Sequence, residues 1–277
     1  MEALTYLFLH VPKAAGTTLS QVVERHVPAR AQYRLGANAQ AAIEAFNHLS
    51  PSEKSRFRLL SGHFPFGVHE QIPGPCAYFT MLREPVDRVA SFYHFILRDP
   101  LHPLHQAMTP AQKASLEVYA RTARDTVMDN GQTRQLAGDW GHVPFGECSE
   151  AMLEQAKANL DQMRVVGLTE RFDASLMLLG HTFGWHHLGY RRANTTQGRP
   201  PKSALDDATR EALIARNTYD LALYAYAEKK FEAQWHAAGL RETEFSRLHP
   251  PPGPCANLLW KLRSRTPKEW LKKAFGR

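Results

Sequence analysis

Three short apolar segments constrain the fold of this chain more than any other feature of its sequence. They are Leu4–Leu9, Ala77–Leu82 and Val165–Leu168, and each is apolar almost without interruption. Continuous apolar runs of about four to eight residues are typical of strands buried on both faces, as in parallel sheets. The sequence therefore predicts a parallel sheet whose two faces are both covered.

Helical patterns separate these segments. Apolar residues recur at helical spacing from Leu19 to Val27 and again from Val86 to Ile96. Further helices are expected around residues 149–161, 171–180, 207–216 and 219–237. Strands that alternate with helices predict an α/β fold of three layers, with a parallel sheet flanked by helices.

Composition excludes several classes of protein. Hydrophobic residues make up 43% of the 277 residues, enough for a globular core, so overall disorder is excluded. The longest apolar run, Leu221–Ala227, is far shorter than the roughly 20 residues of a membrane helix. Cys76, Cys148 and Cys255 are too few and too widely spaced for a disulfide scaffold or a thiolate zinc site. Without a basic lead before its first apolar patch, the chain is expected to be cytoplasmic.

The C-terminal segment differs from the rest of the chain. His249–Pro254 (HPPPGP) predicts a stiff linker, which divides the chain into a main domain over residues 1–249 and a tail over residues 250–277. The tail carries Trp260, Trp270 and Phe275 among seven basic residues from Lys261 onward. This pattern favours an amphipathic helix that contacts a membrane surface or a partner, or packs on the main domain. The net charge of +7 does not choose among a nucleic acid, a membrane and a small polyanion.

The first chemical motif follows the first predicted strand. It reads HVPKAAGTTL from His10 to Leu19, which predicts a tight turn and then the start of a helix. A helix start offers unpaired N–H groups and the positive end of its dipole to an anion. Lys13 adds a positive charge, Gly16 permits a close approach, and Thr17 and Thr18 cap the helix or donate to oxygens. The motif is that of a phosphate-binding turn.

This turn is not a Walker A loop. In the Walker A pattern the lysine follows the second glycine, whereas Lys13 precedes Gly16 and no glycine precedes Lys13 in the motif. The difference disfavours an ATPase or a kinase. The alternative is a plain strand–turn–helix in which Thr17 caps the helix and Lys13 is solvated.

A second motif, REPVDRVASFY, follows the strand that ends at Leu82. Arg83 stands at the carboxyl end of this strand, where open α/β sheets bind their ligands. Arg88 and Ser91 are three residues apart and are expected to share a helix face away from the apolar stripe. An arginine with a serine suits a second phosphate. Alternatively, Arg83 and Arg88 pair with Glu84 and Asp87 in a surface network.

Together, HVPKAAGTTL and LREPVDRVASFY resemble the sulfotransferases that use 3′-phosphoadenosine 5′-phosphosulfate (PAPS). The resemblance is to the carbohydrate branch that contains the heparan sulfate and uronyl 2-O-sulfotransferases. It continues over roughly residues 4–231 through SGH at 61–63, NGQTRQLAG at 130–138, VGLTERFD at 166–173, NTT at 194–196, and Asn217, Asp220 and Tyr224. It implies a sulfotransferase fold related to P-loop NTPases. It also implies transfer of a sulfuryl group from PAPS to a hydroxyl of a saccharide or glycoconjugate, with PAP as product.

The resemblance also implies roles for individual residues. The 5′-phosphosulfate maps to Lys13, Ala15, Gly16, Thr17 and Thr18, and the 3′-phosphate maps to Arg83 and Ser91. A late loop would cover the nucleotide through Asn194, Thr195 and Arg199 or Lys202. His63 corresponds to the catalytic base, with His94 as the alternative, and Lys13 is suited to stabilise the leaving group. Acceptor loops are expected at 64–75 and 99–126.

The sequence supports other functions less strongly. Lysine and arginine supply the positive charge that the reaction needs, so no metal is required. Some histidines come near to the spacing of metal ligands, but no carboxylate and no third ligand accompany them in a recognisable metal-binding motif. These histidines are His102, His105, His181, His186 and His187. A P-loop-like nucleotide kinase and a basic protein that binds an anionic ligand or a membrane remain as alternatives, and no nucleic-acid motif is present.

Overall fold

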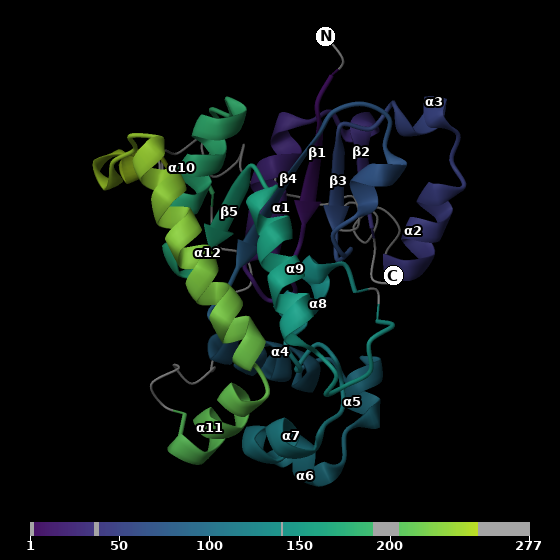
Figure 1. The fold of residues 1–277 in the computed structure, drawn as a ribbon, viewed down its shortest axis with the longest axis vertical. Helices are drawn as coiled ribbons and strands as arrows, with labels where there is room; N and C mark the ends of the chain where they lie inside the picture. The colour runs from purple at the N-terminus through teal and green to yellow at the C-terminus, as the bar shows by residue number, and fades with distance from the viewer. Residues whose placement is uncertain (1–2, 36–38, 140, 191–204, 249–277) are drawn as a thin grey trace, which may run out of the picture.

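Five parallel strands form the centre of the molecule (Figure 1). The structure is a computed structural model that describes residues 3–35, 39–139, 141–190 and 205–248. The strands lie in the order β2-β3-β1-β4-β5, and every neighbouring pair is parallel. Their bounds are β1 Thr5–Leu9, β2 Gln32–Arg34, β3 Leu59–Gly62, β4 Cys76–Leu82 and β5 Val165–Leu168. The predicted parallel sheet is confirmed, and β1, β4 and β5 are the three predicted strands.

Helices cover both faces of this sheet. On one face, α12 (Thr218–Ala237) packs against β5 and α9 (Glu150–Asp161), and α9 packs against α8 (Gly131–Ala137). On the other face, α10 (Phe172–Phe183) packs against β5, and α1 (Gly16–Val23) leads to His26, whose ring stacks on Trp185 just beyond α10. The three-layer α/β fold is therefore confirmed, and the helices expected near 149–161, 171–180, 207–216 and 219–237 are all present.

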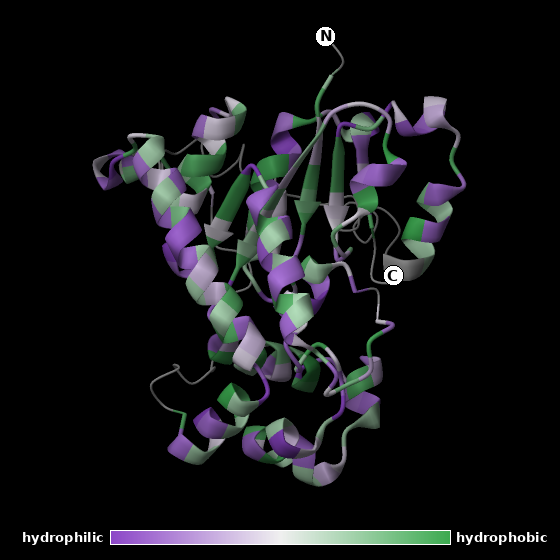
Figure 2. Ribbon diagram, viewed as in Figure 1, coloured by the Kyte–Doolittle hydropathy of each residue, from purple (hydrophilic) through white to green (hydrophobic). Residues whose placement is uncertain are grey.

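The main core lies between these layers. The strands are the most apolar elements, whereas the outer surfaces of the helices are polar (Figure 2). Phe8 and Phe79 stack on adjacent strands with ring centroids 5.1 Å apart, and Phe79 meets Trp185 edge to face at 5.9 Å. Burial of such rings stabilises the sheet at roughly 25 cal/mol per Å² of apolar surface. Among the described residues, no helix is both long and apolar enough to cross a membrane.

A second group of helices lies beyond the carboxyl ends of the strands. The strands point toward α4 (Pro85–Leu97), and below it lie α5 (Pro103–Ala107), α6 (Pro110–Ala114), α7 (Leu116–Thr122) and α11 (Asp207–Ala215), which we call the helical lobe (Figure 1). Its own apolar cluster joins Val89 and Ile96 of α4 to Tyr119 and Leu213. The expectation of a loop over 99–126 is wrong, because Pro, Thr and Ser at the helix starts of this stretch nucleate three short helices.

Short elements complete the described chain. Helices α2 (Ala39–Asn47) and α3 (Pro51–Lys54) connect β2 to β3. The segment 64–75 contains one 3₁₀ turn, Val68–Gln71. The remaining 3₁₀ turns are Glu24–His26, Ala29–Ala31, Thr169–Arg171 and Glu242–Leu248.

Candidate active site

The turn between β1 and α1 has the backbone of a ligand-binding site. Lys13 and Ala15 both adopt left-handed conformations, with φ of 68° and 56°. Such conformations are unfavourable for residues with a side chain and concentrate at functional sites. The N-cap residue of α1, Ala15, makes no side-chain capping hydrogen bond, and the first turn of α1 carries no acidic residue. The turn therefore presents backbone N–H groups at the positive end of the helix dipole.

Gly16 is required because a ring lies against it. A Cβ added at this position would lie 1.7 Å from Nε2 of His10. The His10 ring also stacks on Phe8, with centroids 5.3 Å apart. Burial, together with the neighbouring His63 and Lys13, lowers the pKa of His10 to about 3. His10 is thus a neutral ring that fixes the geometry of the turn.

The sheet register places His63 beside this turn. Leu9 of β1 pairs with Gly62 of β3, so the next residues, His10 and His63, lie side by side at the carboxyl edge of the sheet. Their ring centroids are 4.3 Å apart, and Nδ1 of His63 lies 2.8 Å from the carbonyl oxygen of His10. Because a carbonyl only accepts hydrogen bonds, Nδ1 carries the proton and Nε2 keeps its lone pair.

The electrostatic surroundings keep His63 neutral. Its side chain reaches solvent, but protein atoms around the ring lower the pKa by desolvation. The hydrogen bond to the His10 carbonyl opposes this shift, and the charge of Lys13 reinforces it. A neutral imidazole with a free Nε2 is the form that can take a proton from a hydroxyl.

Gln135 of α8 holds the same carbonyl group from another side. Its Nε2 donates to the carbonyls of His10 at 3.2 Å and Phe64 at 3.0 Å. The backbone carbonyl of Gln135 accepts a hydrogen bond from the N–H group of Phe66 at 3.1 Å. Gln135 thereby fixes the segments on both sides of the histidine pair. Gln135 belongs to the NGQTRQLAG motif at 130–138, but the sequence alone gives no role to this residue.

Arg83 connects the end of β4 to the turn. Its Nη1 donates to the carbonyl of Lys13 at 2.9 Å, and its Nε donates to Asp87 at 2.8 Å. The N–H and carbonyl of Arg83 form two hydrogen bonds with the amide of Gln132, at 3.1 and 2.9 Å. The alternative pairing of Arg83 with Asp87 is therefore present, and the same guanidinium also reaches the turn.

Comparisons with known proteins show the family to which the chain belongs. Residues 5–248 match the family model described as galactose-3-O-sulfotransferase. The chain belongs to this family. Its relatives include heparan-sulfate 6-O-sulfotransferase 1-B of Danio rerio, 26% identical over 88% of this chain and 70% of the relative. They also include heparan-sulfate 6-O-sulfotransferase 1 of Homo sapiens, 24% identical over 83% of this chain and 66% of the relative. The crystal structure of mouse sulfotransferase SULT7A1 complexed with PAP covers all of this chain and 90% of its own, at 12% identity and a TM-score of 0.37.

Membership of this family confirms the expected carbohydrate sulfotransferase and disfavours the kinase alternative. The heparan-sulfate relatives are named as 6-O-sulfotransferases, whereas the sequence motifs resemble the branch that contains 2-O-sulfotransferases. The chain spans about two thirds of the length of these relatives.

Arg88 does not lie where the sequence predicted. The side chain is fully buried, with 0% of its surface exposed, so its expected place on a polar helix face is wrong. Its Nη2 donates to the carbonyl of Val127 at 2.8 Å and lies 3.5 Å from Asp220. Burial lowers the pKa of Arg88, and the charge of Asp220 opposes this shift. The sulfotransferase therefore uses Arg88 to join α4 to α12, and Arg88 takes no part in the surface network.

The Asn130–Gly138 motif is organised by the same carboxylate. Asp220 accepts from the N–H groups of Gln132 at 3.2 Å and Thr133 at 2.7 Å, at the start of α8. Asn130 in turn accepts from the N–H groups of Tyr219 at 2.9 Å and Asp220 at 3.1 Å. Hydrogen bonds in both directions therefore join the Asn130–Gly138 motif to the first turn of α12, and they position Gln132 and Gln135.

The other predicted site residues are placed as follows. Thr17 is exposed in the first turn of α1, whereas Thr18 is buried beside it. Ser91, 6% exposed, lies two turns into α4, and His94 is half-buried further along that helix. Residues 194, 195, 199 and 202 (Asn194, Thr195, Arg199, Lys202) and the tail 250–277 lie outside the described residues. These assignments stay predictions.

Two of the histidines considered as metal ligands, His102 and His105, have other partners. Nδ1 of His102 accepts from the N–H of Leu104 at 3.2 Å and caps α5, and Nδ1 of His105 donates to the carbonyl of Ile96 at 3.0 Å. In the described part of the chain, no three His, Cys, Asp or Glu side chains are grouped to hold a metal ion.

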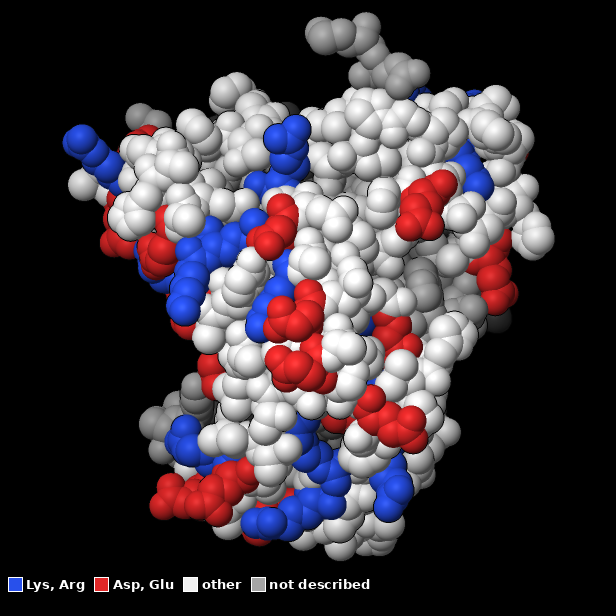
Figure 3. Space-filling view, viewed as in Figure 1, with Lys and Arg blue, Asp and Glu red and all other residues white. Residues whose placement is uncertain are grey.

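Charge distinguishes the turn from two hollows of the protein, one of which borders Arg83 through Asp87. One hollow, of about 430 Å³, is lined by Glu84, Asp87, Glu170, Glu228 and Glu232 beside Arg171. Burial raises the pKa of Glu228, as do Glu170, Glu232 and Glu84, which shows how concentrated the negative charge is. This carboxylate hollow repels a polyanionic donor. On the face seen in Figure 3, basic and acidic residues are interspersed and form no single basic surface.

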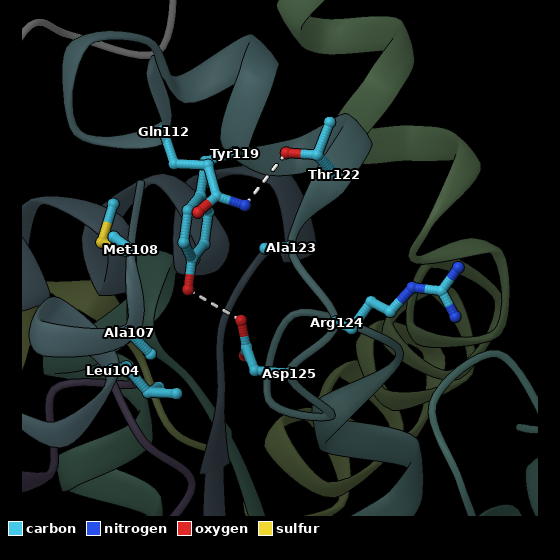
Figure 4. A pocket seen from close by; sticks show the side chains of 9 residues that line it. All are labelled: Leu104, Ala107, Met108, Gln112, Tyr119, Thr122, Ala123, Arg124 and Asp125. Carbon is cyan, nitrogen blue, oxygen red and sulfur yellow. Dashed lines mark hydrogen bonds between the residues drawn. The ribbon is translucent and has the colours of Figure 1, made fainter. Parts of the chain in front are cut away.

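The second hollow lies in the helical lobe. It has a volume of about 290 Å³, and its lining includes Leu104, Met108, Tyr119 and Asp125 (Figure 4). Tyr119 donates to Asp125 at 2.7 Å, and Arg124 points away from this pair. Burial raises the pKa of Asp125, and the hydrogen bond from Tyr119 opposes this shift. No positive side chain points into this hollow among those that Figure 4 draws, so it does not suit the donor either.

Proposed function

We propose that this protein transfers a sulfuryl group from PAPS to a hydroxyl of a saccharide. One observation carries the proposal. The three motifs that contain Lys13, His63 and Arg83 follow β1, β3 and β4, which are neighbours in the sheet order β3-β1-β4. The carboxyl ends of adjacent parallel strands form the usual ligand site of open α/β sheets.

The turn suits the phosphosulfate end of the donor. The N–H groups at the start of α1 and the ammonium group of Lys13 offer positive charge from two directions. PAPS would supply the sulfuryl group and a phosphate leaving group. Lys13 would neutralise the charge that develops on the bridging oxygen as the S–O bond to phosphate breaks. Arg83 and Ser91 would hold the 3′-phosphate, with Arg83 exchanging its contact with Asp87 for the ligand.

The histidine pair suits the acceptor end. A hydroxyl is a weak nucleophile until a base removes its proton. Nε2 of His63 would accept that proton as the hydroxyl oxygen bonds to sulfur, while the His10 carbonyl holds Nδ1–H and keeps the ring oriented. The imidazolium then formed would pass the proton to solvent, which the exposed ring reaches. Base catalysis of this kind contributes typically about 10²–10⁴-fold.

The acceptor class follows from the relatives. The family name refers to the 3-O position of galactose, and the heparan-sulfate relatives act, by name, on a 6-O position. We infer a saccharide acceptor, either a heparan-sulfate-like chain or a galactoside. The cytoplasmic location stays a prediction from the sequence.

Transfer from radiolabelled PAPS tests the proposal directly. The full-length protein is incubated with [³⁵S]PAPS and de-O-sulfated heparan sulfate, or with N-acetyllactosamine. We expect label on one of these saccharides with and without EDTA. Lys13→Ala should lower the rate by about 10²–10³-fold, the range for loss of one preorganised charge stabiliser. Lys229→Ala, an exposed lysine of α12, is the matched control and should retain full activity.

Binding separates the donor from the acceptor. Calorimetry should show that PAP binds without magnesium and that Arg83→Ala weakens PAP binding. An Arg83→Ala variant that binds PAP as the wild type does would remove the 3′-phosphate assignment. Binding of ATP with magnesium in preference to PAP would favour the kinase alternative.

A further inference from the structure

Phe95 is an exposed aromatic residue that touches the turn. Among the described residues, the exposed large hydrophobic side chains are Phe95, Leu101 and Ile214, with 37%, 82% and 39% of their surface exposed. Phe95 stands out because Nζ of Lys13 lies over its ring, 4.4 Å from the centroid. The face of an aromatic ring attracts a cation at this distance.

The Phe95 ring is itself held by its neighbours. It lies 6.5 Å from the ring of Phe92, one turn earlier on α4. His102 meets it nearly edge to face, with centroids 5.7 Å apart and an interplanar angle of 83°. His102 is fixed in turn because its Nδ1 caps α5. Helices α4 and α5 together therefore orient the ring on which the ammonium group rests.

Lys13 is held at its other end as well. Its backbone adopts a left-handed conformation, and its carbonyl accepts from Arg83, the residue two positions before α4. The lysine therefore lies along α4, with its backbone tied near the start of the helix and its ammonium group resting near the end. A lysine stem has four rotatable bonds and loses considerable rotamer entropy when its tip must occupy one place.

We propose that Phe95 is a positioning residue for Lys13, holding the ammonium group in place for sulfuryl transfer. The inference rests on the proposed function. The ring contacts the ammonium group through its aromatic face, and the bridging oxygen of the donor would approach the ammonium group from another side. The contact makes no hydrogen bond of its own, so it restricts the lysine without competing for its donors.

Kinetics of Phe95 variants test this role. Phe95→Leu keeps an apolar side chain but removes the ring, and it should lower kcat about three- to tenfold, the range for one cation–π contact. The KM for PAPS should change less than about twofold, because the N–H groups of α1 and Arg83 still bind the nucleotide. Phe95→Tyr keeps the ring and should restore kcat. Ile214→Ala, at an equally exposed position on α11, is the control and should leave kcat unchanged.

These variants overturn the inference under two outcomes. An unchanged kcat in Phe95→Leu would show that the ring does not position the lysine. Equal losses of kcat in Phe95→Leu and Phe95→Tyr would show that packing, and not the aromatic face, is what matters. Phe95→Leu also loses ring contacts with Phe92 and His102, so kcat is compared per folded enzyme at a temperature well below the melting temperature of both variants.

A spectroscopic measurement needs no activity. With ¹³C-labelled lysine, the ring current of Phe95 should shift the Hε signal of Lys13 upfield, and Lys13→Arg identifies that signal by its loss. We expect the shift to persist in Phe95→Tyr and vanish in Phe95→Leu. An unshifted signal in the wild type overturns the inference even if the enzyme is active. A shifted signal in a protein that transfers no sulfuryl group overturns the proposed function instead.

Discussion

The Nδ1–H group of His63 donates to the backbone carbonyl of His10 across 2.8 Å, and this bond fixes the tautomer of His63. The bond exists because β1 and β3 are parallel neighbours that pair Leu9 with Gly62. The proposed base and the proposed phosphate-binding turn, which lie on separate segments, are thereby joined through one carbonyl group.

The pH dependence of catalysis should report His63. Burial lowers the pKa of its imidazole below the ordinary value of 6.5. A base acts only when deprotonated, so kcat/KM should be constant above about pH 6.5 and fall as the pH drops through the lowered pKa. The measurement is kcat/KM for the acceptor from pH 4.5 to 9. A midpoint above 6.5 would contradict the assignment of His63 and direct attention to His94.

Gln135 should matter for turnover and little for donor binding. In Gln135→Leu, the carbonyls of His10 and Phe64 lose a shared donor, and the His63 ring loses its fixed support. We expect kcat to fall about tenfold, while calorimetry shows unchanged affinity for PAP. Gln162→Leu, an exposed glutamine at the end of α9, is the control. Weakened PAP binding in Gln135→Leu would place this residue in the donor site.

Gly16→Ala should disturb the whole turn. The added Cβ would meet the His10 ring, which is confined by Phe8 and His63. Overpacking of this kind costs about 1–3 kcal/mol, so the melting temperature and PAP affinity should both fall. The double variant His10→Ala/Gly16→Ala removes the obstacle and should recover most of the lost stability. Equal stability of Gly16→Ala and the wild type would show that the ring does not press on Gly16.

Asp220→Asn should destabilise the protein strongly. The carboxylate caps α8 and lies beside the fully buried Arg88, so its removal deprives a buried positive charge of the carboxylate that most favours it. Breaking a buried pair costs about 3–5 kcal/mol, which urea unfolding measures. Glu117→Gln breaks the exposed pair with Arg121 and should cost less than about 1 kcal/mol. A cost below 1 kcal/mol for Asp220→Asn would mean that Arg88 needs no counterion.

The strands that can be predicted from the sequence are those marked by a pattern within their own residues. β1, β4 and β5 are continuous apolar runs, and the layers follow from them. β2 is three residues long with two polar side chains, and β3 ends in Ser61 and Gly62, so neither stands out as a strand. Only the register of β3 with β1 brings His63 to the turn. The family resemblance named His63, but no local pattern could place it.

Several contacts of polar and aromatic side chains could not be predicted from the sequence. The sequence predicts Arg88 on a polar helix face because its spacing from Ser91 puts both residues away from the apolar stripe. Its partner, Asp220, is 132 residues away in the sequence, so helical spacing gives no sign of the pair. Gln135 acts through backbone carbonyls, which no residue pattern records. The position of Phe95 in the sequence of α4 does not distinguish it from other residues on the surface of that helix. Its contact with Lys13 depends on how the turn and α4 are placed in space.

A crystal structure of the protein with PAP tests the central claim most directly. The account predicts the 5′-phosphate at the start of α1, within hydrogen-bond distance of Nζ of Lys13 and of the N–H groups of Gly16 and Thr17. The 3′-phosphate should contact Arg83, and Nε2 of His63 should face the open side of the 5′-phosphate. PAP bound elsewhere, with Lys13 and Arg83 making no contact to either phosphate, would contradict the account.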